Sequence, residues 1–204
     1  MINTIIFDIG NVLADFTWRE QLEKLGYTGD MLERIAKASV LSETWNEYDR
    51  AVLDDEEIIQ RFVDNDPEIE ADIRRCFADK KGMVTRNDYA IPWIKELKQR
   101  GYKVLYLSNF GRSAELDCAE ALDFMPYMDG GILSHRVKVI KPMPEIYKLL
   151  IEQYDLDPKE CVFIDDTEKN LTGASGFGIH TILFKNVSQA KAELEKMLNY
   201  HVFP

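Results

Sequence analysis

The feature that most constrains the fold is a short apolar run at the start of the chain that ends at a carboxylate. Residues 4–7 read Thr-Ile-Ile-Phe, Asp8 follows directly, and Gly10 comes two positions later. A run of β-branched and aromatic residues bounded by Asp and Gly predicts a buried strand. Ligands of open α/β sheets bind at the carboxyl ends of the strands. We therefore expect this strand to deliver Asp8 to a ligand site.

Three further apolar runs end at polar or charged side chains, and each predicts another strand. Because such strands share one sheet, their last residues are expected to converge on one place. The runs and the residues after them are 104–107 with Ser108 and Asn109, 137–140 with Lys141 and Pro142, and 162–164 with Asp165 and Asp166.

Helix and strand patterns alternate along the second half of the chain. Such alternation predicts an α/β fold with a Rossmann-like parallel sheet and helices on both faces. The predicted helices cover 90–100, 113–122, a segment from 144 onward, 169–177 and 189–199. The predicted strands, besides those above, are 131–134 and 180–184.

Residues 15–85 have a different character, because their apolar residues recur at helical spacing throughout. This segment holds 18 Asp and Glu against 10 Lys and Arg, and Asp54–Glu57 is typical of a helix start. We predict an α/β core of residues 1–14 and 86–204, with residues 15–85 inserted as a helical cap. An insertion after the first strand is well placed to act as a lid.

The composition of the chain limits the kinds of partner that it can bind. The net charge of -11 argues against nucleic acid, which requires clustered Lys and Arg. No stretch approaches the roughly 20 apolar residues of a membrane-spanning helix, so we expect no membrane partner. The 3 scattered cysteines suggest reduced thiols in a cytoplasmic protein. We expect a monomer or weak homodimer.

The converging side chains suit attack on a phosphoryl group, so the expected partner is a small phosphorylated substrate. The Asp8 carboxylate can form an acyl phosphate, which divides a difficult hydrolysis into two easier steps. Mg²⁺ prefers carboxylates, phosphate and water, and Asp165 and Asp166 supply further carboxylates beside Asp8. Ser108 and Asn109 can donate hydrogen bonds to phosphate oxygens, and Lys141 can neutralise both Asp8 and the transferred group.

The four motifs, in this order, resemble those of the haloacid dehalogenase-like hydrolase superfamily. They are Phe7–Leu13, Leu107–Asn109, Lys141–Pro142, and Ile164–Asp166 followed by Asn170. In detail the chain is similar to the YihX-like sugar-1-phosphate phosphatase subgroup. The resemblance implies Asp8 as the nucleophile, and Lys141 and Ser108 holding the phosphoryl group beside the Ile9–Gly10 backbone. It also implies Mg²⁺ bound by Asp8, the Gly10 carbonyl oxygen and Asp166, with Asp165 adjacent.

Gly10 departs from the usual pattern of that superfamily, in which a second Asp at this position is the general acid and base. A positioned acid contributes about 10²–10⁴-fold. We therefore predict that phosphate esters with good leaving groups are hydrolysed much faster than simple alkyl phosphates. Two alternatives stay open: a haloacid dehalogenase that uses Asp8 as its nucleophile, and a phosphate-binding pseudo-enzyme of low turnover.

Substrate choice is expected to come from the insertion, where Trp45, Tyr48 and Arg50 form a polar and aromatic cluster with Asp49. Trp45, Tyr48 and Arg50 are our candidate substrate contacts. The alternative is structural: Trp45 belongs to the core of the insertion, and Arg50 pairs with a neighbouring acid.

Overall fold

The computed structural model describes residues 1–199, and a parallel sheet forms its centre. The sheet has five strands in the order β5-β4-β1-β6-β7, all neighbours being parallel. This confirms the predicted α/β fold. The strands are β1 (Thr4–Phe7), β4 (Lys103–Ser108), β5 (Gly130–Leu133), β6 (Cys161–Asp165) and β7 (His180–Leu183).

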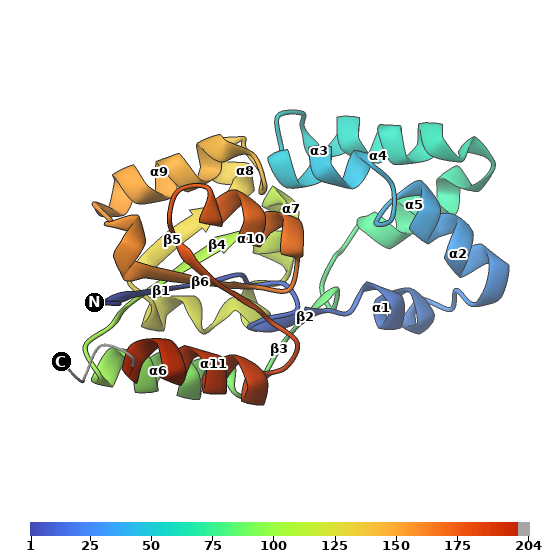
Figure 1. The fold of residues 1–204 in the computed structure, drawn as a ribbon. Coiled ribbons are helices and arrows are strands. Elements are labelled where there is room, and N and C mark those ends of the chain that lie inside the picture. Colours follow the sequence, from blue (N-terminus) through green and yellow to red (C-terminus); the bar gives the residue numbers. More distant parts are fainter. Residues whose placement is uncertain (200–204) are drawn as a thin grey trace.

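Helices cover both faces of this sheet, as Figure 1 shows. One face carries α9 (Pro144–Tyr154) and α10 (Glu168–Ser175), and the other carries α6 (Ala90–Gln99) and α11 (Val187–Asn199). The shorter helices of this part are α7 (Arg112–Asp117), α8 (Ser134–Val137) and the 3-10 turns Ala119–Leu122, Met125–Tyr127 and Pro158–Glu160.

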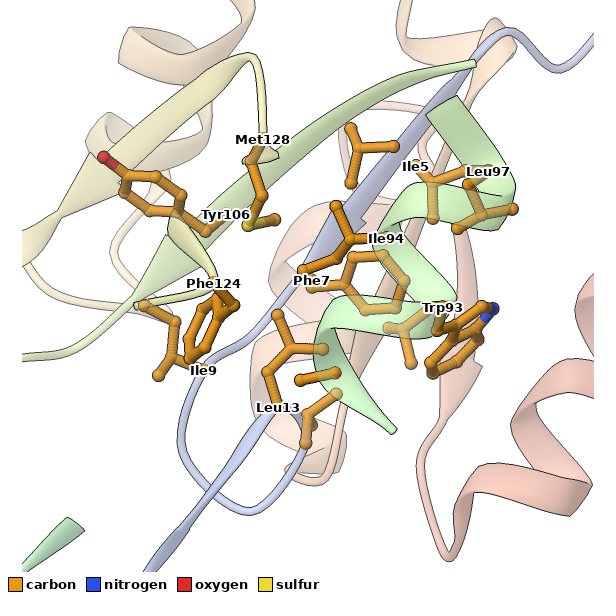
Figure 2. Packing of buried hydrophobic residues seen from close by; sticks show 14 of the residues in the cluster. Ile5, Phe7, Ile9, Leu13, Trp93, Ile94, Leu97, Tyr106, Phe124 and Met128 are labelled. Carbon is orange, nitrogen blue, oxygen red and sulfur yellow. The ribbon is translucent and has the colours of Figure 1, made fainter. Parts of the chain in front are cut away.

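Strand β1 supplies side chains to the cores on both faces, because successive residues of a strand point to opposite sides. Ile5 and Phe7 pack in the cluster that contains Trp93 of α6 (Figure 2), where the Phe7 and Trp93 rings meet edge to face at 4.8 Å. Ile6 packs in the opposite cluster with Ile146 of α9. A strand buried on both faces explains the unbroken apolar run before Asp8.

Residues between β1 and α6 form a second group of helices with its own hydrophobic cluster. An antiparallel pair, β2 (Ala14–Phe16) and β3 (Val84–Arg86), connects this group to the sheet (Figure 1). The helices are α1 (Trp18–Lys24), α2 (Gly29–Ala38), α3 (Thr44–Arg50), α4 (Asp55–Asn65) and α5 (Glu70–Phe77), with a 3-10 turn at Pro67–Ile69.

The acidic helix start predicted near residue 54 is a capping box at the beginning of α4. Asp54 accepts a hydrogen bond from the Glu57 backbone at 2.9 Å, and the Glu57 side chain accepts one from the Asp54 backbone at 3.0 Å. The backbone N–H groups at the start of a helix have no acceptor within the helix, and each of these two side chains accepts a hydrogen bond from one of them.

Two predicted elements differ from the structure. Residues 137–140 are not a strand, because α8 ends at Val137 and Lys138 takes the left-handed conformation with φ 62°. The alternation Val-Lys-Val-Ile imitates a strand, but Val137 and Val139 simply pack against the cluster under α9. The helix predicted over 113–122 is broken after Asp117, and a 3-10 turn follows.

The three cysteines are buried and free of disulfides. None of the helices in the described part of the chain combines the length and apolar character needed to cross a bilayer.

Candidate active site

The site lies at the carboxyl ends of the three central strands, as the sequence predicts. Phe7, the last residue of β1, pairs with Tyr106 of β4 and with Ile164 of β6. Asp8 therefore emerges between the ends of these two neighbours. Its backbone N–H donates to the Ile164 carbonyl at 2.9 Å, which fixes the start of the loop that follows.

Lys141 reaches this place from a loop and not from a strand end. The Asn109 side chain holds the lysine backbone at two points: its Oδ1 accepts from Lys141 N at 2.7 Å, and its Nδ2 donates to Lys141 O at 3.1 Å. The buried ammonium Nζ then lies 2.8 Å from Asp8 Oδ1 and 2.7 Å from Asp165 Oδ2. The Asn109 amide thus positions Lys141, a role that the sequence analysis did not anticipate.

Asp165 is completely buried, and its carboxylate is held by protein groups on both oxygens. Oδ1 accepts from the Thr167 backbone at 2.7 Å, Oδ2 contacts Lys141, and Asn170 Nδ2 lies 3.2 Å from each oxygen. These contacts leave Asp165 behind the wall of the site.

Asp166 faces the opposite way and lines the cavity described below. Its Oδ2 accepts a hydrogen bond from Asn11 Nδ2 at 3.0 Å, and its Oδ1 accepts one from the Thr167 hydroxyl at 3.2 Å. Ligand atoms of Asp8, Asp165 and Asp166 all lie within 4.8 Å of one another. Three carboxylates this close, with one lysine among them, could hold a divalent cation.

Burial and charge act in opposite directions on the two central groups. Burial raises the pKa of the Asp8 carboxyl well above its usual range, Lys141 lowers it, and the Asp165 charge raises it further. Burial alone would lower the pKa of Lys141, but Asp8 and Asp165 outweigh that effect and raise the pKa. The lysine is therefore charged, and two neighbouring carboxylates hold it in place.

A cavity of about 260 Å³ opens in front of these groups, between the sheet and helix α3. Both parts of the chain contribute to its walls. The sheet side supplies Asp8, Gly10, Ser108, Asn109, Lys141 and Asp166, and the other side supplies Phe16, Trp45, Tyr48 and Asp49. The structure thus brings together most of the residues that the sequence analysis selected.

Three selected residues do not line the cavity: Ile9, Arg50 and Asp165, the last of which is completely buried behind the wall. The Ile9 side chain lies in the core, and its backbone N–H donates to Asp8 Oδ1 at 2.7 Å. Arg50 pairs with Glu47 at 3.2 Å, the structural alternative that the sequence left open. Trp45 fits both of its readings, because it lines the cavity and also contacts the ring of Phe62 in the neighbouring cluster.

Asp49 is the acidic residue that the sequence analysis passed over in favour of Arg50. It is 7% exposed and lines the cavity. Burial, and then the charge of Asp8, raise the pKa of Asp49 to about 8, against a smaller effect of Lys141. Helical spacing could have found it: Tyr48 and Asp49 lie three and four residues after Trp45, on the same face of α3, whereas Arg50 lies on another.

The relatives of this chain include proteins with several activities. It is 26% identical to bifunctional epoxide hydrolase 2 of Sus scrofa over 96% of its length, but spans only 39% of that protein. It is 24% identical to the phosphorylated carbohydrates phosphatase of Thermotoga maritima, covering 95% of this chain and 91% of the relative. It is 20% identical to (S)-2-haloacid dehalogenase 1 of a Pseudomonas species, covering 92% and 80%.

Comparison with solved structures shows the same fold. A haloacid dehalogenase family enzyme from Bacteroides thetaiotaomicron, solved as a magnesium complex, superposes with a TM-score of 0.71 at 22% identity, covering 96% of this chain and 99% of that one. The family model described as haloacid dehalogenase-like hydrolase matches residues 2–178. Sequence, site and fold agree, and the chain belongs to the haloacid dehalogenase-like hydrolase family.

Proposed function

We propose that this hydrolase is a Mg²⁺-dependent phosphatase of small phosphorylated metabolites, sugar phosphates among them, and that it works through a phosphoaspartyl intermediate on Asp8. One observation carries the proposal. The Lys141 ammonium bridges Asp8 and Asp165 at the base of a small cavity, with the Asp166 carboxylate beside them. This arrangement suits an anion that approaches a nucleophilic carboxylate.

The residues present fit a divalent cation. Asp8, Asp165 and Asp166 carry more negative charge than Lys141 alone can balance. Burial is the main cause of the raised pKa of Asp8, and the Asp165 charge adds to it. A hard cation with oxygen ligands would balance the excess negative charge. Asp8, the Gly10 carbonyl oxygen and Asp166 would hold the ion. Asp165 would not bind the ion directly, because its oxygens are occupied by Lys141, Thr167 and Asn170.

When bound, Mg²⁺ would shield the charge between Asp8 and the phosphoryl oxygens. The protein groups account for the other requirements. Asp8 Oδ1 is held by the Ile9 backbone and Lys141, which leaves Oδ2 for attack on phosphorus. Lys141 and the Ser108 hydroxyl neutralise and orient the transferred group. The leaving alcohol departs toward the cavity, and water then hydrolyses the acyl phosphate.

We also propose that residues 15–85 act as a cap that selects the substrate. Trp45 and Tyr48 of α3 form the wall opposite Asp8, and a cavity of about 260 Å³ admits only a small molecule. An aromatic wall suits the apolar face of a sugar ring. The similarity to the Thermotoga phosphatase supports a phosphorylated carbohydrate, and a sugar 1-phosphate is the finer expectation from the sequence.

A haloacid dehalogenase is the second candidate, because one relative carries that name. A carboxylate can displace a halide from carbon without a cation. Dehalogenation therefore gives no reason for three carboxylates within 4.8 Å of one another. The acidic cluster is the observation that favours phosphate.

The test is hydrolysis of p-nitrophenyl phosphate and of a panel of phosphorylated sugars, with Mg²⁺ and with chelator. The proposal expects phosphate release that requires Mg²⁺ and disappears in Asp8→Asn. Arg19→Gln, an exposed residue paired with Glu33, is a matched control that should keep full activity. Chloride release from 2-haloacids without Mg²⁺, with no phosphate release, would support the dehalogenase instead. Binding of phosphate without turnover of any ester would support the pseudo-enzyme.

A further inference from the structure

Two carboxyl groups line the cavity without a part in the phosphoryl site. Asp15 is exposed and accepts a hydrogen bond from Asn87 at 3.0 Å, whereas Asp49 is buried. Asp49 comes from α3, on the wall opposite Asp8, and it is 7% exposed. Within residues 1–199, the Asp49 carboxyl has no hydrogen-bond partner. The carboxylates of Asp8, Asp165 and Asp166 each have at least one. A buried carboxyl without a protein partner is costly unless a ligand or water completes it.

The backbone of Asp49 is fastened to the sheet side of the cavity. The Ser134 hydroxyl donates to the Asp49 carbonyl oxygen at 2.6 Å, and Ser134 Oγ accepts from the Phe110 backbone N–H at 2.8 Å. Phe110 lies two residues after Ser108, the last residue of β4. Ser134 therefore links Asp49 to the loop that carries the predicted phosphate ligands.

Two cations secure the end of the same helix. Arg112 donates to the Ala51 carbonyl at 3.2 Å, and Lys138 donates to it at 2.5 Å. Positive charges at a helix C-terminus complement the helix dipole. The Tyr48 hydroxyl meets Ser113 at 3.1 Å. These contacts fix the position of Asp49 over the site through groups other than its own carboxyl.

On the sheet side of the cavity, the residue two positions after Asp8 has no side chain. Gly10 lines the same cavity, and a Cβ built there would meet nothing within 4 Å. Burial is the largest effect on the Asp49 carboxyl and raises its pKa, which favours the protonated form. A protonated carboxyl can donate a proton, which Gly10 cannot.

We propose that Asp49 supplies, from the helical insertion, the general acid and base that Gly10 lacks. This inference rests on the proposed phosphatase function. As Asp8 Oδ2 forms its bond to phosphorus, the ester P–O bond breaks and Asp49 gives its proton to the departing oxygen. The Asp49 carboxylate then takes a proton from the water that attacks phosphorus. Inorganic phosphate leaves, and both Asp8 and Asp49 return to their starting states.

Asp49→Asn tests this through the dependence of kcat/KM on the leaving group. With Asp49 acting, the unaltered protein should hydrolyse p-nitrophenyl, phenyl and simple alkyl phosphates with a shallow dependence, in contrast to the strong preference for good leaving groups that Gly10 alone predicts. Asp49→Asn should lose about 10²–10⁴-fold on alkyl phosphates and far less on p-nitrophenyl phosphate, whose leaving group needs no proton. If Gly10 leaves the site without any acid, the unaltered protein itself shows the steep dependence, and the inference is wrong.

A second readout separates chemistry from structure. With p-nitrophenyl phosphate, Asp49→Asn should release a burst of nitrophenol close to one per active site, because the acyl phosphate forms but then loses its base. Glu47→Gln, on the same helix but outside the cavity, is the control and should behave like the unaltered protein. An equal loss on all esters without a burst would mean that Asp49 is only structural.

Rescue completes the test. Gly10→Asp, for which the cavity has room, should restore alkyl phosphate hydrolysis in the Asp49→Asn background. If the unaltered protein hydrolyses phosphate esters but neither leaving-group selectivity nor rescue appears, the Asp49 inference fails and the phosphatase proposal stands. If it hydrolyses no phosphate ester, both fail together.

Discussion

Asp165 and Asp166 are neighbours in the sequence, but their surroundings assign them different tasks. Asp165 is buried behind the cavity and holds the Lys141 ammonium at 2.7 Å. Asp166 lines the cavity and is held from one side by Asn11 at 3.0 Å. At the scale of single residues, the acidic pair is therefore one group that positions the lysine and one that faces the cavity, where the proposed Mg²⁺ would bind.

Substitution of each acid by its amide should separate the two tasks. Asp166→Asn should raise the Mg²⁺ concentration for half-maximal activity by more than about tenfold, the lower limit for loss of an outer-shell partner, with little change in stability. Asp165→Asn should lower the free energy of unfolding and the turnover, because the buried Lys141 loses a partner, and should change the Mg²⁺ dependence much less. Mg²⁺ titrations of activity and urea unfolding measure both. Identical behaviour of the two variants would contradict the assignment.

The sequence predicted residues at strand ends better than residues on the helical insertion. Asp8, Ser108 and Asp165 were found because a run that stops at a polar residue marks a strand end. Arg50 was preferred to Asp49 because clustering in the sequence was read without the helical period. The two-point hold of Asn109 on Lys141 has no sequence pattern, since a loop brings them together.

At the scale of elements, the contact between α3 and the start of α7 depends on the absence of a side chain at Gly111. A Cβ there would lie 2.2 Å from Cε1 of the buried Tyr48 ring. The backbone at Gly111 has φ -73°, so steric space and not conformation requires glycine. The close approach lets Tyr48 reach Ser113 and keeps the cavity wall in place.

Gly111→Ala should therefore displace α3 and lower kcat/KM, with a loss of about 1–3 kcal/mol in the free energy of unfolding, as for other overpacked sites. Tyr48→Ala removes the ring that the added methyl would meet. In a Tyr48→Ala background, Gly111→Ala should therefore have almost no further effect on stability or activity. Urea unfolding and p-nitrophenyl phosphate hydrolysis of the two single variants and the double variant provide a double-mutant cycle. If the effects of the two single substitutions simply add in the double variant, the Tyr48 ring and the added methyl group are not in contact.

Within the insertion, Arg34 of α2 pairs with Asp66 at the end of α4 through two hydrogen bonds of 2.9 and 2.8 Å. The hydrogen bonds from Arg34 lower the pKa of Asp66 in the folded protein. The stabilisation is present above the unfolded pKa of an Asp, about 3.9, and is lost as the pH falls through the lower folded pKa.

We expect Asp66→Asn to destabilise the protein at neutral pH. The difference in stability between the two proteins should disappear as the pH falls below the pKa of an unperturbed carboxyl. Urea unfolding of both proteins between neutral and acidic pH measures it. In an Arg34→Gln background the pH dependence of the Asp66→Asn effect should vanish. A difference in stability that grows on acidification would have the wrong sign and would reject the pairing.

Among the elements, the sheet strands were predictable and the connections less so. The run 137–140 alternates like a strand, but the chain has already left the sheet after β5, and Lys138 turns it with a left-handed backbone. The break after Asp117 likewise follows from packing and not from local preference, because Ala119–Leu122 is compatible with either helix type.

At the scale of the molecule, the fold divides its hydrophobic residues into clusters with separate purposes. Two clusters hold helices against the two faces of the sheet, and a third holds α1–α5 together. Periodicity indicated the helical character of residues 15–85, because that segment lacks strand patterns in its interior. It did not predict β2 and β3, strands of 3 residues each that are too short to leave a periodic signal.

The cavity lies where these two parts meet, so its chemistry depends on both. The sheet side carries Asp8 and Lys141, and the α1–α5 side carries Trp45 and Asp49. The sequence indicated each half separately. Their distance across the cavity depends on backbone contacts such as Ser134 with Asp49, which only the structure reveals.

The most direct test of the central claim is chemical capture of the phosphorylated enzyme. An aspartyl phosphate is an acyl phosphate, and borohydride reduces it to homoserine. Protein mixed with a phosphate ester and Mg²⁺, quenched during turnover and reduced, should contain homoserine at position 8 by peptide mass spectrometry, and should not contain it when the ester or Mg²⁺ is left out. Unmodified Asp8 in an enzyme that is releasing phosphate, or homoserine at another position, would contradict the account.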